Sequence, residues 1–250
     1  MFYLLLIKNN YNKLLFTCPQ KDMHTIWFAI DIDHTLLRTE QFQYQAWKKV
    51  LHPSIPFSQE EYSANYCGRW SKEIAQELAN IMSADPETFY ADRMNALDHI
   101  LERQKQFSLM PGVEKFFSYI HQNKIPYALV TWWSDEESLN KINKSDLKDI
   151  VSQKKIPLVS KNDYTHSKPH PEPYIMGKQK LQELPGGRYI TKFVAFEDTL
   201  SWMLSALNAG YDNVYIIPHI WSKLSFDKYI QEHWLPKNVT QLKSLADYKL

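Results

Sequence analysis

Short apolar runs recur along this chain, and amphipathic helical segments separate them. The clearest is IWFAIDI at residues 26–32, which is rich in β-branched and aromatic residues and ends at acidic side chains. Uninterrupted apolar runs of this length indicate strands buried in a sheet. Further runs stand at 125–133 (IPYALVTWW), 155–161 (KIPLVSK), 189–198 (YITKFVAFED) and 213–218 (NVYIIP).

Helical patterns lie between these runs, around residues 174–181 and at SWMLSALNAG (201–210), where Gly210 closes the helix. Strands that alternate with helices are typical of a parallel sheet with right-handed crossovers. The chain is therefore predicted to be an α/β protein with a doubly wound, Rossmann-like parallel sheet.

The segment from residue 40 to residue 107 has a different pattern. Apolar residues recur there at helical spacing in EEYSANYCGRWSKEIAQELANIM and ADRMNALDHILERQKQ, without a convincing strand. A Pro-Gly turn and an amphipathic helix follow in LMPGVEKFFSYIHQNK. We predict an inserted helical unit at 40–107, within a core formed by 23–39 and 108–250.

The charge balance limits the class of partner. The 250 residues include 29 Lys and Arg against 28 Asp and Glu, so no basic surplus favours nucleic acid or an anionic membrane. A small molecule is the expected partner, bound by a monomer or weak dimer. Cys18 and Cys67 show no metal-ligand or disulfide spacing, which favours a reducing compartment and structural roles.

The first residues, MFYLLLIKNN, are too short an apolar stretch to span a bilayer and lack the features of a secretory signal. A cytoplasmic location is the expectation. Residues 1–22 form an N-terminal extension unlike the rest of the chain, and our hypothesis is that Met23 is the natural start or that this leader is loosely attached.

Polar residues suited to phosphate chemistry follow the predicted strands. The first strand ends at Asp31 and Asp33, the second at Thr131, and Lys168 follows the third. A later strand ends in the acidic pair Glu197 and Asp198. Because ligands of such sheets bind outside the carboxyl ends of the strands, we expect these side chains to meet at one edge.

This set of residues can support phosphoryl transfer. Of the two side chains Asp31 and Asp33, one can attack phosphorus while the other protonates the leaving oxygen. The attack brings like charges together, so fixed donors and a hard cation are required. Thr131 offers a hydroxyl and Lys168 a compact positive charge for the phosphate oxygens.

Magnesium is the expected cation, because it prefers oxygen ligands and takes only one or two carboxylates. Asp31, Asp198 and a backbone carbonyl near Asp33 would suit it, with Glu197 as an auxiliary ligand. The acidic pair has an alternative role, since acidic residues at a helix start also favour the helix dipole.

Four segments together resemble the motifs of the haloacid dehalogenase superfamily, in that family's order. The likeness spans residues 23–218 and is to the phosphatase and phosphomutase branch with a helical cap. It implies that the helical unit at 40–107 is the cap domain and that 23–39 and 108–250 form the catalytic core. The four segments are DIDHTLLRTE, YALVT, SKPHPEPY and FEDTL. The resemblance implies a phosphorylated Asp31, an acid and base at Asp33, a phosphate ligand at Thr131, a charge-balancing Lys168, and magnesium ligands at Glu197 and Asp198. A carboxylate at Asp33 is what dehalogenases lack, so phosphate esters are the expected substrates.

Departures from the family pattern leave alternatives open. TEQFQYQAWKKV is similar to β-phosphoglucomutase, but Gln43 stands where that mutase has a histidine, so hydrolysis is favoured over mutase activity. His34 and Trp202 occupy positions that are usually glycine, and Trp132 and Trp133 crowd the predicted site. A protein that keeps the fold for binding or regulation, with weak catalysis, is therefore a further alternative.

Substrate selection is expected to come from the cap. The segment NYCGRWSKE resembles the family's substrate-facing loop, so Arg69 or Lys72 is predicted to bind an anionic group distant from the scissile phosphate. Ordinary charges on a helix surface are the alternative. His166 and His170 flank Lys168 without a third ligand at transition-metal spacing, and we interpret them as loop residues.

Overall fold

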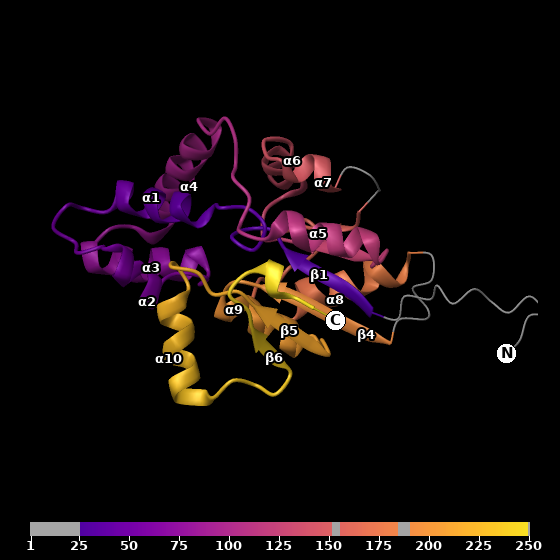
Figure 1. The fold of residues 1–250 in the computed structure, drawn as a ribbon. Coiled ribbons are helices and arrows are strands. Elements are labelled where there is room, and N and C mark those ends of the chain that lie inside the picture. The colour runs from indigo at the N-terminus through magenta and orange to yellow at the C-terminus, as the bar shows by residue number, and fades with distance from the viewer. Residues whose placement is uncertain (1–25, 152–155, 185–190, 250) are drawn as a thin grey trace, which may run out of the picture.

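The computed structural model describes residues 26–151, 156–184 and 191–249. They form a six-stranded sheet in the order β3-β2-β1-β4-β5-β6, and each neighbouring pair is parallel. Figure 1 shows this sheet with helices packed around it. The strands are β1 Ile26–Asp31, β2 Tyr127–Val130, β3 Leu158–Val159, β4 Lys192–Glu197, β5 Asn213–Ile216 and β6 Val239–Gln241. The predicted doubly wound parallel α/β fold is confirmed.

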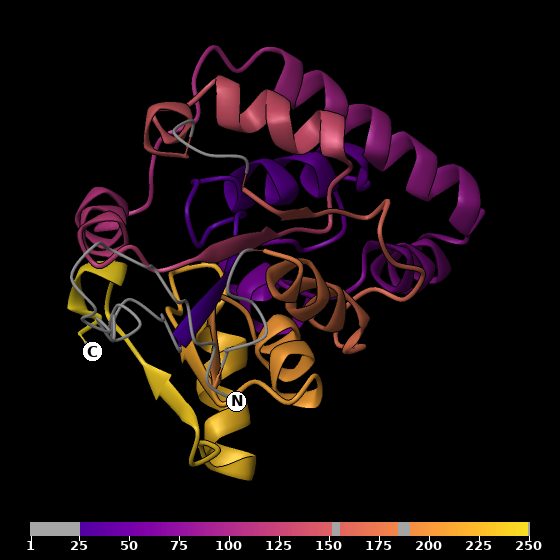
Figure 2. The same ribbon diagram turned by 90° about the vertical axis from the view of Figure 1, so that its right-hand side faces the viewer.

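Side chains alternate across β1 and so build a core on each face of the sheet. Phe28 and Ile30 belong to a cluster with Phe116 of α5 (Val113–Gln122). Ala29, between them, belongs to a cluster with Tyr174 of α8 (Glu172–Gln182) and Met203 of α9 (Leu200–Asn208). Figure 2 shows α5 and the α8–α9 pair on opposite sides of the strands. This double burial explains why the strand sequences are continuously apolar.

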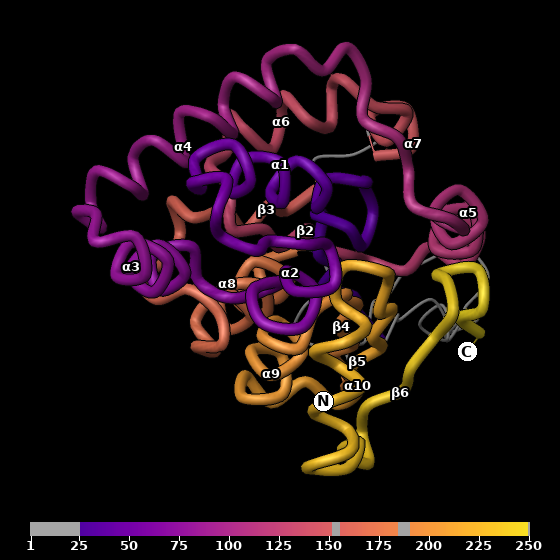
Figure 3. The backbone as a smooth tube through the Cα atoms, turned by 90° about the vertical axis from the view of Figure 1, so that its left-hand side faces the viewer, coloured from indigo at the N-terminus to yellow at the C-terminus, as the bar shows by residue number. Residues whose placement is uncertain are grey.

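Four helices form a separate layer over the carboxyl ends of the strands (Figure 3). They are α1 Glu40–Val50, α2 Gln59–Asn65, α3 Ser71–Met82 and α4 Pro86–Glu102. Their own apolar cluster includes Trp47, Leu78 and Phe89. The predicted cap at 40–107 covers these helices, and its boundaries stay a prediction.

The helical layer contacts the core through α2 and through the loop that follows α2. Ser63 on α2 donates a 3.2 Å hydrogen bond to the carbonyl of Ile220. Gly68 has a φ of +76°, and a Cβ placed on it would lie 2.8 Å from Cβ of Thr199. The loop at Gly68 therefore approaches the core more closely than a larger residue would permit.

The remaining elements complete the core, and some of them differ from the sequence prediction. They are α6 Asp135–Asn143, α7 Leu147–Val151, α10 Lys223–His233 and the 3₁₀ helix Leu245–Asp247. Neither α6 nor β6 was predicted, and the run at 155–161 yields only the short β3. In the described part of the chain, no helix is both long and apolar enough to cross a membrane. Predictions for residues 1–22, Cys18 and Met23 lie outside the described residues.

Candidate active site

Parallel pairing of β1 with β4 brings three carboxylates together at the carboxyl ends of the strands. Asp31 ends β1, Glu197 ends β4, and Asp198 follows directly. Each offers a carboxylate oxygen, and these oxygens all lie within 4.8 Å of one another. All three side chains are almost completely buried.

Lys168 lies between two of these carboxylates. Its Nζ is 3.2 Å from Oδ1 of Asp31 and 3.4 Å from Oε1 of Glu197. The ammonium also packs against the ring of Trp202. Burial lowers the pKa of Lys168 to about 8, although the Glu197 and Asp31 carboxylates oppose that shift. The structure thus places Lys168 beside Asp31, where the family resemblance had put it.

The electrostatics of the cluster favour a bound cation. Burial raises the pKa of Asp31 and of Asp198 to about 8, and it also raises the pKa of Glu197. Asp31 Oδ2 and Glu197 Oε2 are buried without a hydrogen-bond partner among the described residues. Asp198 Oδ2 is held 2.7 Å from Nε2 of His219. An all-oxygen donor set with unpaired buried oxygens fits a hard cation such as Mg²⁺.

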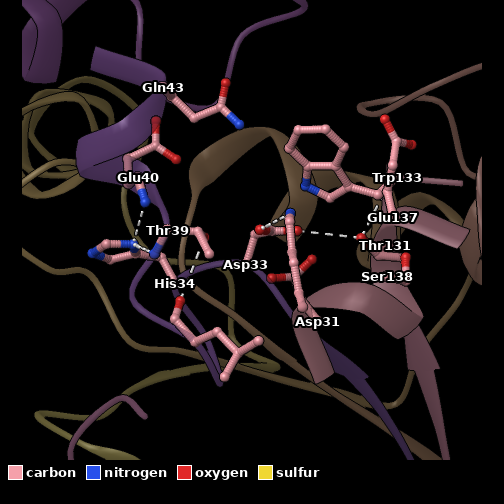
Figure 4. A network of polar contacts seen from close by, with 12 residues as sticks. Asp31, Asp33, His34, Thr39, Glu40, Gln43, Thr131, Trp133, Glu137 and Ser138 are labelled. Carbon is pink, nitrogen blue, oxygen red and sulfur yellow. Dashed lines mark hydrogen bonds and ion pairs between the residues drawn. The ribbon is translucent and has the colours of Figure 1, made fainter. Parts of the chain in front are cut away.

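Asp33 is not one of these three carboxylates and has polar contacts of its own. Its Oδ1 forms a 2.7 Å ion pair with Lys141, and its Oδ2 accepts a 3.3 Å hydrogen bond from Thr131 Oγ1. Thr131 Oγ1 in turn accepts from the backbone N–H of Trp133 at 3.3 Å. Figure 4 shows Asp31, Asp33, Thr131 and Trp133 converging at this point. The structure therefore joins Thr131 to Asp33, and its predicted contact with phosphate stays a prediction.

A cavity of about 290 Å³ lies between these residues and the helical layer. Asp31, Asp33, Lys168 and Asp198 line its core side. Its volume is at the lower end of the range for small-molecule sites, roughly 300–1,000 Å³. The aromatic residues of its wall are Trp47, Tyr62, Trp70, Tyr90, Trp132, Tyr164 and Trp202.

The two cap residues predicted to bind substrate occupy different places. Arg69 lines the cavity, and its guanidinium forms a 2.9 Å salt bridge with Glu77. Lys72 lines a second hollow between α3 and α4 and not the cavity itself, and its ammonium lies 5.6 Å from the centroid of the Tyr90 ring. The geometry thus favours Arg69 over Lys72 as a substrate contact.

Arg93 on α4 is a cavity residue that sequence reasoning missed. It is 1% exposed, donates to Oε1 of Gln43, and lies 4.7 Å from the centroid of the Trp47 ring. Its Nε is buried without a partner in the described parts of the chain. The helical spacing of the apolar residues in α4 places residue 93 on the buried face. An arginine at such a position could have been recognised as a candidate site residue.

Glu40, at the start of α1, adds an acidic group to the lining of the cavity. Tyr62 and Cys67 donate to its Oε1, the latter at 3.5 Å. Burial raises the pKa of the Cys67 thiol well above its usual value, which supports the predicted inert role.

Two histidines, His34 and His219, pack against each other beside the site. His34 has a φ of 60°, the left-handed conformation that favours glycine, and its Nδ1 accepts from the backbone N–H groups of Thr39 and Glu40. The His34 and His219 rings lie 3.8 Å apart. His219 follows β5, so the strand-end rule applied to NVYIIP would have found it.

The loop that carries Lys168 is braced by Glu172. Its carboxylate accepts from the backbone N–H groups of Thr165 and His166 at 3.0 and 2.8 Å, and it contacts the His166 ring at 2.8 Å. Those hydrogen bonds hold the pKa of Glu172 at about 2. His166, His170 and Glu172 do lie together, which supplies the third group that the sequence did not reveal. Since Glu172 already holds the loop backbone, the cluster has a structural explanation.

Comparisons with known proteins agree with this geometry. The family model described as haloacid dehalogenase-like hydrolase matches residues 28–216. A phosphorylated carbohydrates phosphatase from Thermotoga maritima is 22% identical over 195 residues, covering 76% of this chain and 83% of the relative. A probable pseudouridine-5′-phosphatase from Drosophila melanogaster is 26% identical over 229 residues, covering 88% and 90%.

A solved structure supports the fold. The crystal structure of CbbY from Rhodobacter sphaeroides in complex with phosphate has a TM-score of 0.65 to this chain at 17% identity. The match covers 89% of this chain and 95% of that chain.

Proposed function

Because the chain belongs to the haloacid dehalogenase-like hydrolase family, we propose that it hydrolyses phosphate monoesters of small metabolites, carbohydrate phosphates foremost, through phosphoryl transfer to Asp31. The observation that carries the proposal is the setting of Asp31. It lines the cavity, keeps Oδ2 unpaired among the described residues, and lies beside both Lys168 and Asp33.

In the first step, an Asp31 carboxylate oxygen attacks the phosphorus atom of the ester. A bond forms between that oxygen and phosphorus, and the bond to the substrate's alcohol oxygen breaks. Asp33 gives its proton to the leaving oxygen, so the alcohol departs neutral. Lys168, paired with Asp31 and Glu197, supplies positive charge where the phosphoryl group is transferred.

In the second step, water attacks the aspartyl-phosphate and Asp33 takes its proton. Phosphate leaves and Asp31 returns to its starting state. The carboxylates of Asp31, Asp198 and Glu197 would hold Mg²⁺, which when bound neutralises the charge of the transferring phosphoryl oxygens. His219 orients Asp198 for that task through the 2.7 Å contact.

The cavity favours a small carbohydrate phosphate. Its aromatic wall can pack on the apolar faces of a sugar or a flat ring, while Arg69, Arg93 and Glu40 offer donors and acceptors for hydroxyl groups. The names of the two relatives point the same way, since one is named as a phosphatase of phosphorylated carbohydrates and the other as a probable pseudouridine-5′-phosphatase.

The decisive experiment measures phosphate release by the full-length chain, with Mg²⁺ and with a chelator. Its substrates are sugar phosphates, phosphoglycolate, nucleoside 5′-monophosphates and p-nitrophenyl phosphate. Asp31→Asn should abolish turnover, whereas the matched control Asp227→Asn, on the surface of α10, should retain it. Peptide mass spectrometry after acid quench should find the phosphoryl group on Asp31.

Other outcomes favour the alternatives. If no substrate releases phosphate, the same proteins are supplied with a hexose phosphate and a bisphosphate activator. Isomerisation without phosphate release would support a mutase instead. Silence in both assays would refute an enzyme and favour a binding or regulatory protein.

A further inference from the structure

A second buried lysine lies beside the reacting groups, and the mechanism above leaves it unused. Lys141 is on α6, and its Nζ lies 2.7 Å from Oδ1 of Asp33. The two side chains are 2% and 9% exposed. Among the described residues Asp33 lines the cavity and Lys141 does not, so the direct contact of Lys141 with the site is its ion pair with Asp33.

We infer that Lys141 is a positioning residue for proton transfer, which holds Asp33 by one oxygen and leaves the other oxygen for the proton that is transferred. The inference rests on the proposed function, because it assigns a role within that reaction. It adds a residue that the family resemblance did not indicate.

The two oxygens of Asp33 have unequal contacts. Oδ1 is held at 2.7 Å by a charged ammonium, whereas Oδ2 receives only the 3.3 Å hydrogen bond from Thr131. Charge-assisted contacts are shorter and stronger than neutral ones. Oδ1 is therefore the anchored oxygen, and Oδ2 is the one free to exchange a proton with a leaving group or with water.

The surroundings of Lys141 keep its ammonium in place. Nζ lies 3.5 Å from the centroid of the buried Trp133 ring, a cation–π contact that adds to the ion pair with Asp33. Helix α6 begins directly after this tryptophan with a capping box between Ser134 and Glu137. The cap fixes the start of the helix, and Lys141 follows two turns later on its buried side.

This placement has a cost that a structural role alone would not justify. A buried ammonium is destabilising unless it is paired, and an apolar side chain of similar length would fill the same space. A short ion pair that fixes the orientation of a catalytic side chain is a role that an apolar side chain cannot fill. The benefit of Lys141 should therefore appear when Asp33 protonates a poor leaving group.

The test compares kcat/KM for two substrates in Lys141→Met. The sugar alkoxide is a poor leaving group and needs the proton from Asp33. The nitrophenolate of p-nitrophenyl phosphate leaves without one. We expect kcat/KM for the sugar phosphate to fall by at least roughly tenfold, the lower part of the range for general acid catalysis, and that for p-nitrophenyl phosphate by less than about threefold. Lys141→Arg should recover most of the loss.

A control and a mutant cycle separate this role from a structural one. Lys223→Met removes the exposed Lys223–Asp227 pair, 2.8 Å apart on α10, and should change neither constant. In an Asp33→Asn background, Lys141→Met should cause no further loss of kcat/KM for the sugar phosphate, since Lys141 acts through Asp33. Thermal unfolding identifies any variant that fails to fold, and Lys141→Gln then takes the place of the methionine variant.

Equal losses for both substrates, or additive losses in the cycle, would overturn the role assigned to Lys141 while leaving the phosphatase intact. Wild-type protein that turns over neither substrate would instead reject the proposed function, and with it this role.

Discussion

Trp202 offers a sharp test of how the site is built, because a second tryptophan provides a matched control. Trp202 is 8% exposed, packs edge-on to Tyr174 with ring centroids 6.3 Å apart, and contacts Lys168. Trp234 is 82% exposed, after the end of α10. The same change, Trp→Ala, thus removes a buried ring in one case and a solvated ring in the other.

The magnitude follows from the burial. Replacing a buried Trp by Ala costs about 3–5 kcal/mol of unfolding free energy. A chain of this length loses roughly 2–4 °C in Tm for each kcal/mol, so Trp202→Ala should lower Tm by roughly 6–20 °C. Surface changes stay within about 0.5 kcal/mol, so Trp234→Ala should move Tm by less than about 2 °C.

Differential scanning calorimetry of both variants in the same buffer measures the two shifts. Turnover gives a second readout, because the ring of Trp202 limits the movement of Lys168 and its loss should lower kcat while Trp234→Ala leaves kcat unchanged. Equal Tm values for the two variants would show that Trp202 is not packed as described, and the reasoning would fail.

Three further predictions concern charge and closure. Burial raises the pKa of Asp31 and Asp198 to about 8 from a usual value of 3.8, so the metal-free fold should lose stability as the pH rises through that window, and Mg²⁺ should raise Tm more at about pH 9 than at about pH 6. A Tm gain from Mg²⁺ that is independent of pH would contradict this. Gly68→Ala should raise KM and lower Tm slightly. A residue with a Cβ is destabilised by about 1–2 kcal/mol in the left-handed conformation of Gly68, and the added Cβ would also collide with Thr199. An unchanged KM would argue against closure at this contact. Arg93→Met should raise KM and leave Tm equal or higher, because it removes a buried cation that has no anionic partner among the described residues. A KM equal to that of the wild type would exclude Arg93 from substrate binding.

Much of the fold could be predicted because its signals are local. A strand buried on both faces must be apolar along its length, so β1, β2 and β4 are visible as continuous runs. The short β3 and β6 are weaker signals, because two or three residues carry little pattern. Helix α6 was not predicted because its sequence is mostly polar, and Lys141 on its buried side interrupts the apolar pattern of an amphipathic helix.

The sequence by itself determined which polar residues stand at the ends of the strands and therefore at one edge of the sheet. Parallel strands must deliver their carboxyl ends to one edge, so Asp31, Lys168 and the acidic pair Glu197–Asp198 could be grouped before any coordinates were known. The family match over residues 28–216 agrees with that grouping.

Only the tertiary structure decided which groups touch across elements. Lys141, Arg93 and His219 come from separate helices and a loop, and each reaches the site through packing between segments far apart in the chain. A lysine on a helix is exposed in most proteins, so its sequence position gives no sign that it will be buried. The pairing of Lys141 with Asp33, 108 residues away, exists because β1 pairs with β2, and α6 follows β2 in the chain. Contacts of that kind depend on the whole fold, and local pattern does not encode them.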